Sequence, residues 1–211
     1  QSLCIDEKWI RIRNDWNYVF TAVGAKIPDL IAIDLYNQKD KSCIKAFLLS
    51  LKLAGFNPYS ITTDLLLGYE SVVKKVFPDC IYNQCVLHAE RDAKRLVRIH
   101  VPDNTKYKKI KELLRKRIRI LFESKKLKQL KKRYYKIIKL KEKTPKRVHC
   151  LFKLLRKYYP KLCISVTNKK VSRTTNPVER AINELEEKYH LTKGFTNFYF
   201  ARFFLKAFQI Y

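Results

Sequence analysis

The stretch LCIDEKWIRI, residues 3–12, carries an aspartate among mostly apolar residues and has the composition of a buried β-strand. Two more apolar segments, 18–23 and 30–36, follow it after short connections. Three consecutive strands joined in this way predict an antiparallel meander. We therefore expect the chain to begin with a sheet that has Asp6 in its first strand.

Helical and extended patterns alternate over the next part of the chain. The expected order is a helix from Asp40 or Ser42 to about residue 54, a strand at 60–64, a helix at 69–76, a strand at 80–84 and a helix at 86–98. The strand at 60–64 belongs to YSITTDLLLGY and ends on a second aspartate, Asp64.

The last part of the chain begins with a basic loop at residues 167–175. Thr175 or Asn176 is the expected cap of the helix that follows, which carries Glu179 in its first turn. An aromatic-rich helix closes the chain, and its aromatic residues are expected in the core.

Positive charge is concentrated in one segment. Lys and Arg outnumber Asp and Glu by 46 to 19, for a net charge of +27, and residues 105–147 supply +17 of it with 20 basic and three acidic residues. The pattern there predicts two amphipathic helices, with a third beginning at Thr144-Pro145. Such an excess is too lopsided for a salt-bridged surface and favours phosphate contact, because neutralising phosphates releases condensed counterions. Nucleic acid is the expected partner, and a passive basic surface or an anionic membrane surface is the alternative.

Asp6, Asp64 and Glu179 stand out because acidic residues are scarce and these three lie in or beside apolar segments. Two aspartates close together in a low-dielectric site would repel each other unless a dication bound between them. Oxygen ligands suit Mg²⁺ or Mn²⁺ better than Zn²⁺. Each carboxylate also has a structural explanation, as a turn residue, a cap or a partner of the helix dipole. The rival ligands are Glu7, Asp34 and Asp92.

Four stretches resemble motifs of the DDE transposases of prokaryotic insertion sequences, in the Mutator-like branch with a Cys-x2-His motif. They are CIDEKWIRI (4–12), ITTD (61–64), QCVLHAERD (84–92) and TTNPVERAINELEEKYHLTKGF (174–195). The order of elements resembles the ribonuclease-H-like fold, in which the first and fourth strands are neighbours at the centre of the sheet. The resemblance implies an α/β fold with a mixed five-stranded sheet flanked by helices. It also implies an all-helical insertion before the last catalytic helix, which fits the 115 positions from Asp64 to Glu179.

Carried over residue by residue, the resemblance makes Asp6, Asp64 and Glu179 the catalytic residues and the ligands of two divalent metal ions, Mg²⁺ or Mn²⁺. The implied enzyme cleaves DNA strands at transposon ends and transfers them to target DNA, acting as a homodimer or a larger assembly. The residues expected to hold the DNA backbone are Lys8, Lys169, Lys170, Arg173 and Arg180. The alternatives are a structure-specific nuclease of the same fold and an inactive DNA-binding remnant of a mobile element.

Cys85 and His88 match the Cys-x2-His element and lie about one helical turn apart. This is the spacing of half a zinc site, which Cys80 or the His149-Cys150 pair would complete. No second tight pair such as CxxC is present, so a packed cysteine and a hydrogen-bonding histidine that support the active site are the preferred interpretation.

The expected organisation is a ribonuclease-H-like core in two parts, 1–104 and 161–211, around a basic helical insertion at 105–160. The chain has no methionine, so we expect it to be a domain of a longer protein. Both tryptophans, Trp9 and Trp16, lie near the first strand, although the family's insertion often carries one. No apolar run is long enough for a membrane span, and the expected location is the cytoplasm, associated with the nucleoid.

Overall fold

The computed structural model of the chain describes residues 1–66, 68–191 and 194–210. It divides into two compact units. The sheet unit comprises Gln1–Asn83 and Lys170–Tyr211, and the helical unit comprises Gln84–Lys169. Residues 192 and 193 of the predicted final motif, and the last residue of the predicted closing helix, lie outside the described residues.

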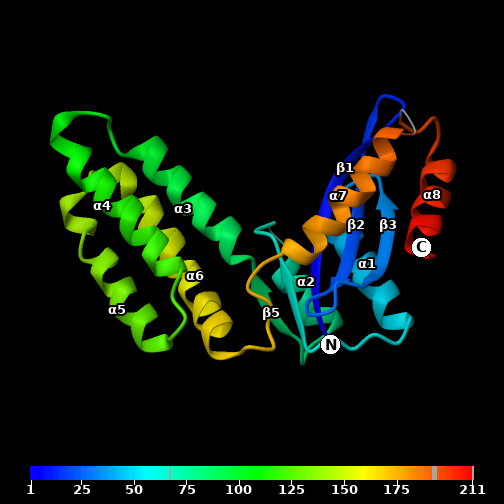
Figure 1. Cartoon of the computed structure of the whole chain (residues 1–211), viewed down its shortest axis with the longest axis horizontal. Coiled ribbons are helices and arrows are strands. Elements are labelled where there is room, and N and C mark those ends of the chain that lie inside the picture. Colours follow the sequence, from blue (N-terminus) through cyan, green and yellow to red (C-terminus); the bar gives the residue numbers. More distant parts are fainter. Residues whose placement is uncertain (67, 192–193, 211) are drawn as a thin grey trace. The chain divides into compact units, whose positions relative to one another are not determined.

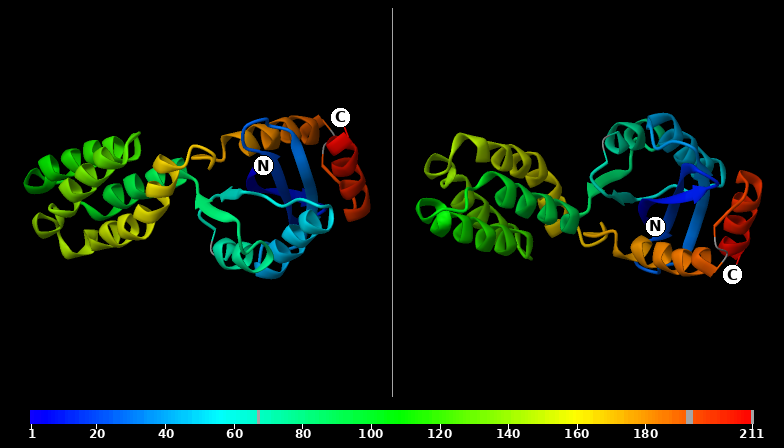
Figure 2. Two further views of the ribbon diagram at one scale, coloured as in Figure 1. Left: turned by 90° about the horizontal axis from the view of Figure 1, so that it is seen from below. Right: turned by 90° about the horizontal axis from the view of Figure 1, so that it is seen from above.

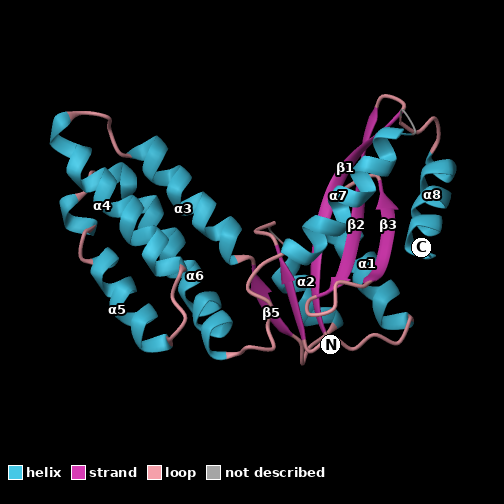
Figure 3. Ribbon diagram, in the orientation of Figure 1, coloured by secondary structure: helices cyan, strands magenta, loops and turns pink. Residues whose placement is uncertain are grey.

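Five strands form one mixed sheet, drawn in magenta in Figure 3. They are β1 (Ser2–Ile12), β2 (Asp15–Gly24), β3 (Leu30–Tyr36), β4 (Ser60–Thr63) and β5 (Ile81–Gln84), in the spatial order β3-β2-β1-β4-β5. The first three strands pair antiparallel, whereas β1 and β4 pair in parallel at the centre. The predicted meander, the predicted neighbours and the ribonuclease-H-like arrangement are therefore confirmed.

Helices cover both faces of this sheet (Figure 2). On one face, α1 (Lys41–Leu53) and α2 (Tyr69–Val76) pack on a core that includes Ile5 and Phe20. On the other face, α7 (Asn176–Leu191) and α8 (Phe198–Ile210) pack on residues that include Cys4 and Val19. Successive residues of a strand point to opposite faces, so burial on both faces explains why apolar residues of these strands occur on both faces.

The predicted cap of α1 is present. The Asp40 carboxylate accepts hydrogen bonds from the Cys43 amide at 2.9 Å and from the Ser42 hydroxyl at 2.7 Å. These bonds favour the ionised form and lower the pKa of Asp40 to about 2, with the Cys43 amide as the largest cause. Asp40 therefore begins the helix that covers one face of the central strands.

The helical unit is built from four helices, coloured green to yellow in Figure 1. They are α3 (Val86–His100), α4 (Thr105–Phe122), α5 (Leu127–Ile138) and α6 (His149–Thr167), with 3₁₀ turns at Lys141–Lys143 and Lys146–Val148 before α6. The apolar face of α3, with Ala89, Ala93 and Val97 buried, belongs to this unit, and α3 contacts both α4 and α6. The compact unit thus extends beyond the predicted insertion at 105–160 at both ends.

The helix predicted to begin at Thr144-Pro145 begins later, at His149. The Thr144 hydroxyl donates to the Lys141 carbonyl at 2.7 Å, so it completes the preceding turn instead of capping the next helix. A 3₁₀ turn over Lys146–Val148 then leads into α6. Within the described ranges, no helix is both long and apolar enough to cross a bilayer.

Candidate active site

Asp6 lies in the middle of β1 on the face that α7 covers. Two residues before it, Cys4 packs against Val178 of α7, and two residues after it, the Lys8 ammonium forms an ion pair with Glu186 of the same helix. Side chains at alternate positions of a strand share a face. Asp6 therefore points to the side of the sheet on which α7 runs.

Asp64 follows the last residue of β4, one position beyond the strand. The parallel register pairs Cys4 with Thr62 and Ile5 with Thr63, so its continuation sets Asp64 beside Asp6. The Asp64 carboxylate accepts the Leu66 amide at 2.9 Å, which holds the first turn after the strand. Strand pairing thus brings together two aspartates that are far apart in the sequence.

The basic loop before α7 is anchored across the ends of these strands. The Thr62 hydroxyl and the Asn83 side-chain amide each donate to the Ser172 carbonyl at 3.0 Å, and the Cys4 thiol donates to the Thr174 carbonyl at 3.4 Å. These bonds from three strands set the point at which α7 begins.

Three carboxylates meet at the centre of the sheet: those of Asp6, Glu7 and Asp64. Each offers an oxygen that lies within 4.8 Å of the oxygens offered by the other two. All three residues are partly buried. The sequence analysis predicted two members of this group, Asp6 and Asp64, as metal ligands and treated the third, Glu7, as a rival.

The surroundings of Glu7 differ from those of Asp6 and Asp64. Burial raises its pKa from 4.5 to about 8, and the nearby carboxylates of Asp64 and Asp6 act in the same direction. The Tyr69 hydroxyl donates a hydrogen bond to Glu7, and this bond and the charge of Lys39 oppose the rise without cancelling it. In the metal-free protein Glu7 therefore holds its proton at neutral pH.

Because the pKa of Glu7 is raised in the folded protein, we expect the free energy of unfolding to fall as pH rises. Between about pH 4.5 and pH 8 the unfolded chain has released the Glu7 proton and the folded chain has not, so folding becomes less favourable with increasing pH, by a few kcal/mol in total. Urea unfolding in a chelator, from pH 5 to pH 9, measures this loss. The Glu7→Gln variant, which mimics the protonated acid, should lack it, so the difference between the two proteins isolates Glu7. Parallel curves for the two proteins would contradict the assignment.

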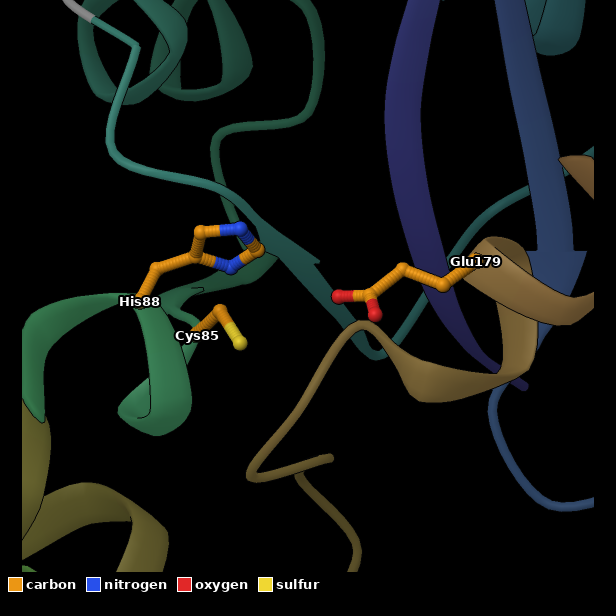
Figure 4. Close-up of side chains that lie close together, drawn as sticks. All are labelled: Cys85, His88 and Glu179. Carbon is orange, nitrogen blue, oxygen red and sulfur yellow. The ribbon is translucent and has the colours of Figure 1, made fainter. Parts of the chain in front are cut away.

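Glu179 lies in the first turn of α7, as expected from the sequence (Figure 4). Its carboxylate accepts a hydrogen bond from the buried Thr175 hydroxyl at 2.8 Å. Val178, beside it, packs on the same sheet face to which Asp6 points. Among the described residues, however, Glu179 does not belong to the close group that Asp6, Glu7 and Asp64 form.

The two other rival carboxylates have partners elsewhere. Asp34 pairs with Arg202 of α8 at 3.2 Å, and Asp92 pairs with Arg95 within α3, also at 3.2 Å. Neither belongs to the carboxylate group at the sheet centre, as far as the described residues go.

The residues predicted to contact DNA have varied surroundings. The Lys8 ammonium pairs with Glu186, and that of Lys170 lies 5.7 Å from the centre of the Tyr59 ring. Burial lowers the pKa of the Arg173 guanidinium. The remaining two, Lys169 and Arg180, are exposed.

Cys85 and His88 belong to the start of α3, in the helical unit (Figure 4). Cys85 is the residue before the helix and is fully buried, and His88 lies in the first turn and is partly buried. Their positions agree with the predicted helical spacing.

One group of cations was missed by the sequence prediction because four of its five members lie before the segment 105–147. Along α3, cationic side chains recur at helical spacing, and with one residue of α4 they line a surface depression whose lining is entirely basic. These residues are Arg91, Lys94, Arg95, Arg98 and Arg115. The four residues on α3 follow the spacing i, i+3, i+4, i+7, and this spacing could have revealed the group from the sequence.

A family model described as a DDE domain, of the IS240 transposase type, matches residues 1–144. The chain belongs to this DDE domain family. The matched residues include Asp6 and Asp64, whereas Glu179 lies beyond them. The chain is accordingly a DDE-type transposase catalytic domain.

Two solved structures resemble parts of the DDE domain. The HTLV-2 integrase catalytic core domain in complex with magnesium is 14% identical, with 46% of this chain and 69% of that chain covered and a TM-score of 0.34. A chain of the simian T-cell lymphotropic virus intasome in complex with PP2A regulatory subunit B56 gamma is also 14% identical, with 74% and 47% covered and a TM-score of 0.33. None of the curated proteins matches the chain.

The residues at the centre of the sheet fit a divalent metal. Asp6, Glu7 and Asp64 offer only carboxylate oxygens, which are the donors that hard cations prefer. The carboxylates of Asp6 and Asp64 both raise the pKa of Glu7, so the site concentrates negative charge that a cation would neutralise.

Proposed function

We propose that the DDE domain cuts DNA at the ends of a mobile element and joins the released 3′ ends to target DNA. The observation that carries this proposal is the convergence of Asp6 and Asp64, from different strands, in a chain of this family. The proposed substrate is DNA, because the chain belongs to the DDE domain family and its net charge of +27 favours a polyanionic partner.

The proposed ligands of Mg²⁺ or Mn²⁺ are Asp6, Asp64 and Glu179. When bound, a pair of such ions activates the attacking oxygen and stabilises the leaving oxygen. The protein itself holds the Asp6 and Asp64 carboxylates in place. The Glu7 amide donates to the Asp6 carboxylate and the Leu66 amide donates to that of Asp64, each at 2.9 Å, so both side chains are oriented by the backbone. Asp6 belongs to the central strand β1 and Asp64 directly follows its neighbour β4, so little reorganisation is needed before reaction.

Glu179 is proposed as the third ligand because it begins the helix that covers the Asp6 face. The bond from the Thr175 hydroxyl fixes its carboxylate at the start of that helix. Glu7, the alternative third ligand, is protonated at neutral pH in the metal-free protein, so it would have to lose its proton before it could bind a cation.

The residues proposed to hold the DNA backbone beside the carboxylates are Lys8, Lys169, Lys170, Arg173 and Arg180. Lys8 would exchange its partner Glu186 for a phosphate. Contacts of this kind position DNA without reading its sequence.

The helical unit is proposed to bind further DNA backbone. In addition to the basic depression on α3, a second one lies between α4 and α5 and is lined by Lys116, Lys132 and Lys136 among other cations. Because these three lysines are exposed, they are available to phosphates.

The salt dependence of DNA binding tests this role of the helical unit. Replacing Lys116, Lys132 and Lys136 by glutamine should lower the slope of log affinity against log salt by about 0.9 for each phosphate that is no longer neutralised, or by about 2.7 for three phosphates. Fluorescence anisotropy with duplex DNA at several salt concentrations measures the slope.

A matched control removes three exposed lysines from the sheet unit, Lys26, Lys45 and Lys75. It changes the net charge equally and should leave the slope close to that of the wild type. An equal change of slope in both triple variants would mean that net charge matters and the depression does not.

A homodimer or larger assembly on DNA is also proposed. We further infer membership of the Mutator-like branch, supported by the Cys85-x-x-His88 element at the start of α3. The preferred role of these two residues is support of the active site, and zinc is the alternative. Metal analysis of the purified protein decides between them, because a zinc site would retain zinc in proportion to protein.

The function is tested by incubating the protein with pre-cut end DNA, a target plasmid and Mn²⁺. Joined products are the expected result. Cuts without joining would indicate a nuclease of the same fold, and retarded but intact DNA would indicate a binding module without activity. Because an end-recognition domain can lie elsewhere in a longer protein, the full-length protein is assayed in parallel.

A further inference from the structure

An exposed cluster of aromatic rings lies on the strands β1 and β2. Trp9 is paired with Tyr18 in the antiparallel register, and Trp16 lies opposite Arg11. The ring centre of Trp9 is 6.1 Å from that of Trp16 and 6.2 Å from that of Tyr18, both in edge-to-face geometry. We call Trp9, Trp16 and Tyr18 the aromatic cluster.

The cluster is open to solvent. Trp9 is 53% exposed and Trp16 is 57% exposed, and Tyr18 is partly buried. Single exposed apolar residues are common on protein surfaces, but large rings that touch one another and remain half exposed mark an interaction site. The rings therefore offer contact area that the described part of the chain leaves uncovered.

Cations flank these rings. The Lys39 ammonium lies 4.9 Å from the centre of the Trp9 ring and 5.5 Å from that of Tyr18, and the Arg11 guanidinium lies 5.9 Å from that of Trp16. Neither Lys39 nor Arg11 has an ion pair among the described residues. Open rings with adjoining positive charges are complementary to a chain that carries both flat bases and phosphates.

The aromatic cluster adjoins the carboxylates. Trp9 follows Glu7 by two residues on the same face of β1, a separation of about 7 Å along a strand. Lys39 is close enough to Glu7 to lower its pKa. A nucleic-acid strand held on the rings would thus lie next to the Glu7 carboxylate, which is itself close to those of Asp6 and Asp64.

Beside Trp16 the surface is hollowed. Arg13, Asn37 and Asn197 line this hollow together with the Trp16 ring. Amide and guanidinium groups can bond to base edges, which a stacked base leaves accessible.

We propose that the aromatic cluster binds unpaired bases of a single-stranded DNA segment by stacking. This deepens the proposed function, on which it rests for the choice of DNA. A blunt duplex keeps its bases stacked inside and cannot offer their faces, so the site favours a strand that is unpaired near the scissile phosphate.

Intrinsic fluorescence reports on this site directly, because the chain has only two tryptophans and both belong to the cluster. In the Asp64→Asn protein, with a chelator present, a (dT)₁₂ oligonucleotide should quench the emission with saturation. A blunt duplex of twelve base pairs should bind through its phosphates and leave the emission nearly unchanged. No catalysis is needed, so a failure of the proposed chemistry and a failure of stacking are distinguishable.

Substitutions of the two tryptophans test whether (dT)₁₂ binds at the aromatic cluster. Each of Trp9→Leu and Trp16→Leu should weaken binding of labelled (dT)₁₂ on the order of ten-fold, while Trp16→Tyr should keep most of the affinity. Duplex affinity should change by less than about two-fold, since phosphate contacts are independent of stacking. The control is Phe203→Leu, which removes a ring of α8 that is 72% exposed.

Three results would overturn the proposal. One is unquenched wild-type emission at saturating (dT)₁₂, a measurement that requires no variant to fold. Another is unchanged (dT)₁₂ affinity in the Trp9→Leu/Trp16→Leu double variant. The third is an emission change that depends on protein concentration without DNA, together with sedimentation showing dimers that the double variant lacks; the rings would then be covered by a second copy of the chain.

Discussion

Replacing Asp64 by asparagine should abolish strand cleavage and joining while leaving DNA affinity equal or higher. The change removes one negative charge from a site where three carboxylates meet. A loss of at least about a thousand-fold in rate is expected, since metal-ion stabilisation of the reacting oxygens contributes several kcal/mol. Affinity should not fall, because the charge that is removed would repel phosphate. Rates come from strand joining with pre-cut ends, and affinity comes from anisotropy in a chelator.

The substitution should leave the fold intact. Asp64 is partly buried, and an asparagine oxygen can still accept the Leu66 amide that the aspartate accepts at 2.9 Å. Thermal unfolding provides the check. The matched control is Asp79→Asn, an exposed aspartate in the loop before β5, which should retain full activity. An Asp64→Asn protein that cuts DNA at the normal rate would rule out Asp64 as a metal ligand.

The second large effect concerns the choice between Glu179 and Glu7 as the third ligand. Glu179→Gln should lower strand joining by at least about a hundred-fold, as expected for the loss of a metal ligand. Glu7→Gln should lower it by less than about ten-fold, because glutamine resembles the protonated acid that Glu7 is at neutral pH. Titration of activity with Mg²⁺ separates the two variants, since loss of a ligand also raises the metal concentration required.

The control on the same helix is Glu187→Gln, an exposed residue later in α7 that should behave as the wild type. The reverse order, with Glu7→Gln inactive and Glu179→Gln nearly normal, would transfer the role of third ligand to Glu7. It would also mean that metal binding removes the Glu7 proton, so the pH dependence of stability described above should disappear when Mg²⁺ is added.

Much of the sheet unit could be predicted from local pattern. The apolar runs around Asp6 and before Asp64 indicated buried strands, and short connections indicated the meander. The helix starts could also be predicted: Asp40, one of the two predicted caps, accepts the Cys43 amide, and Glu179 lies in the first turn of its helix. These features depend on residues that are close in sequence, and sequence spacing determines them directly.

Other features depended on which surfaces pack together. The periodicity of α3 showed an apolar face, but not that this face packs on α4 and α6. Spacing alone likewise did not show that Thr144 completes the turn before α6. An amphipathic pattern identifies the buried side of an element and leaves its partner open.

By itself the sequence determined the strands, their order, and the two aspartates that converge. The tertiary structure alone decided that Glu7 joins them and that Trp9, Trp16 and Tyr18 form one exposed cluster. The physical reason is the distance along the sequence over which each interaction acts. Alternation and capping act over a few residues, whereas the register of β1 against β2 and β4, and the burial of Glu7 against Tyr69, exist only after distant segments have packed.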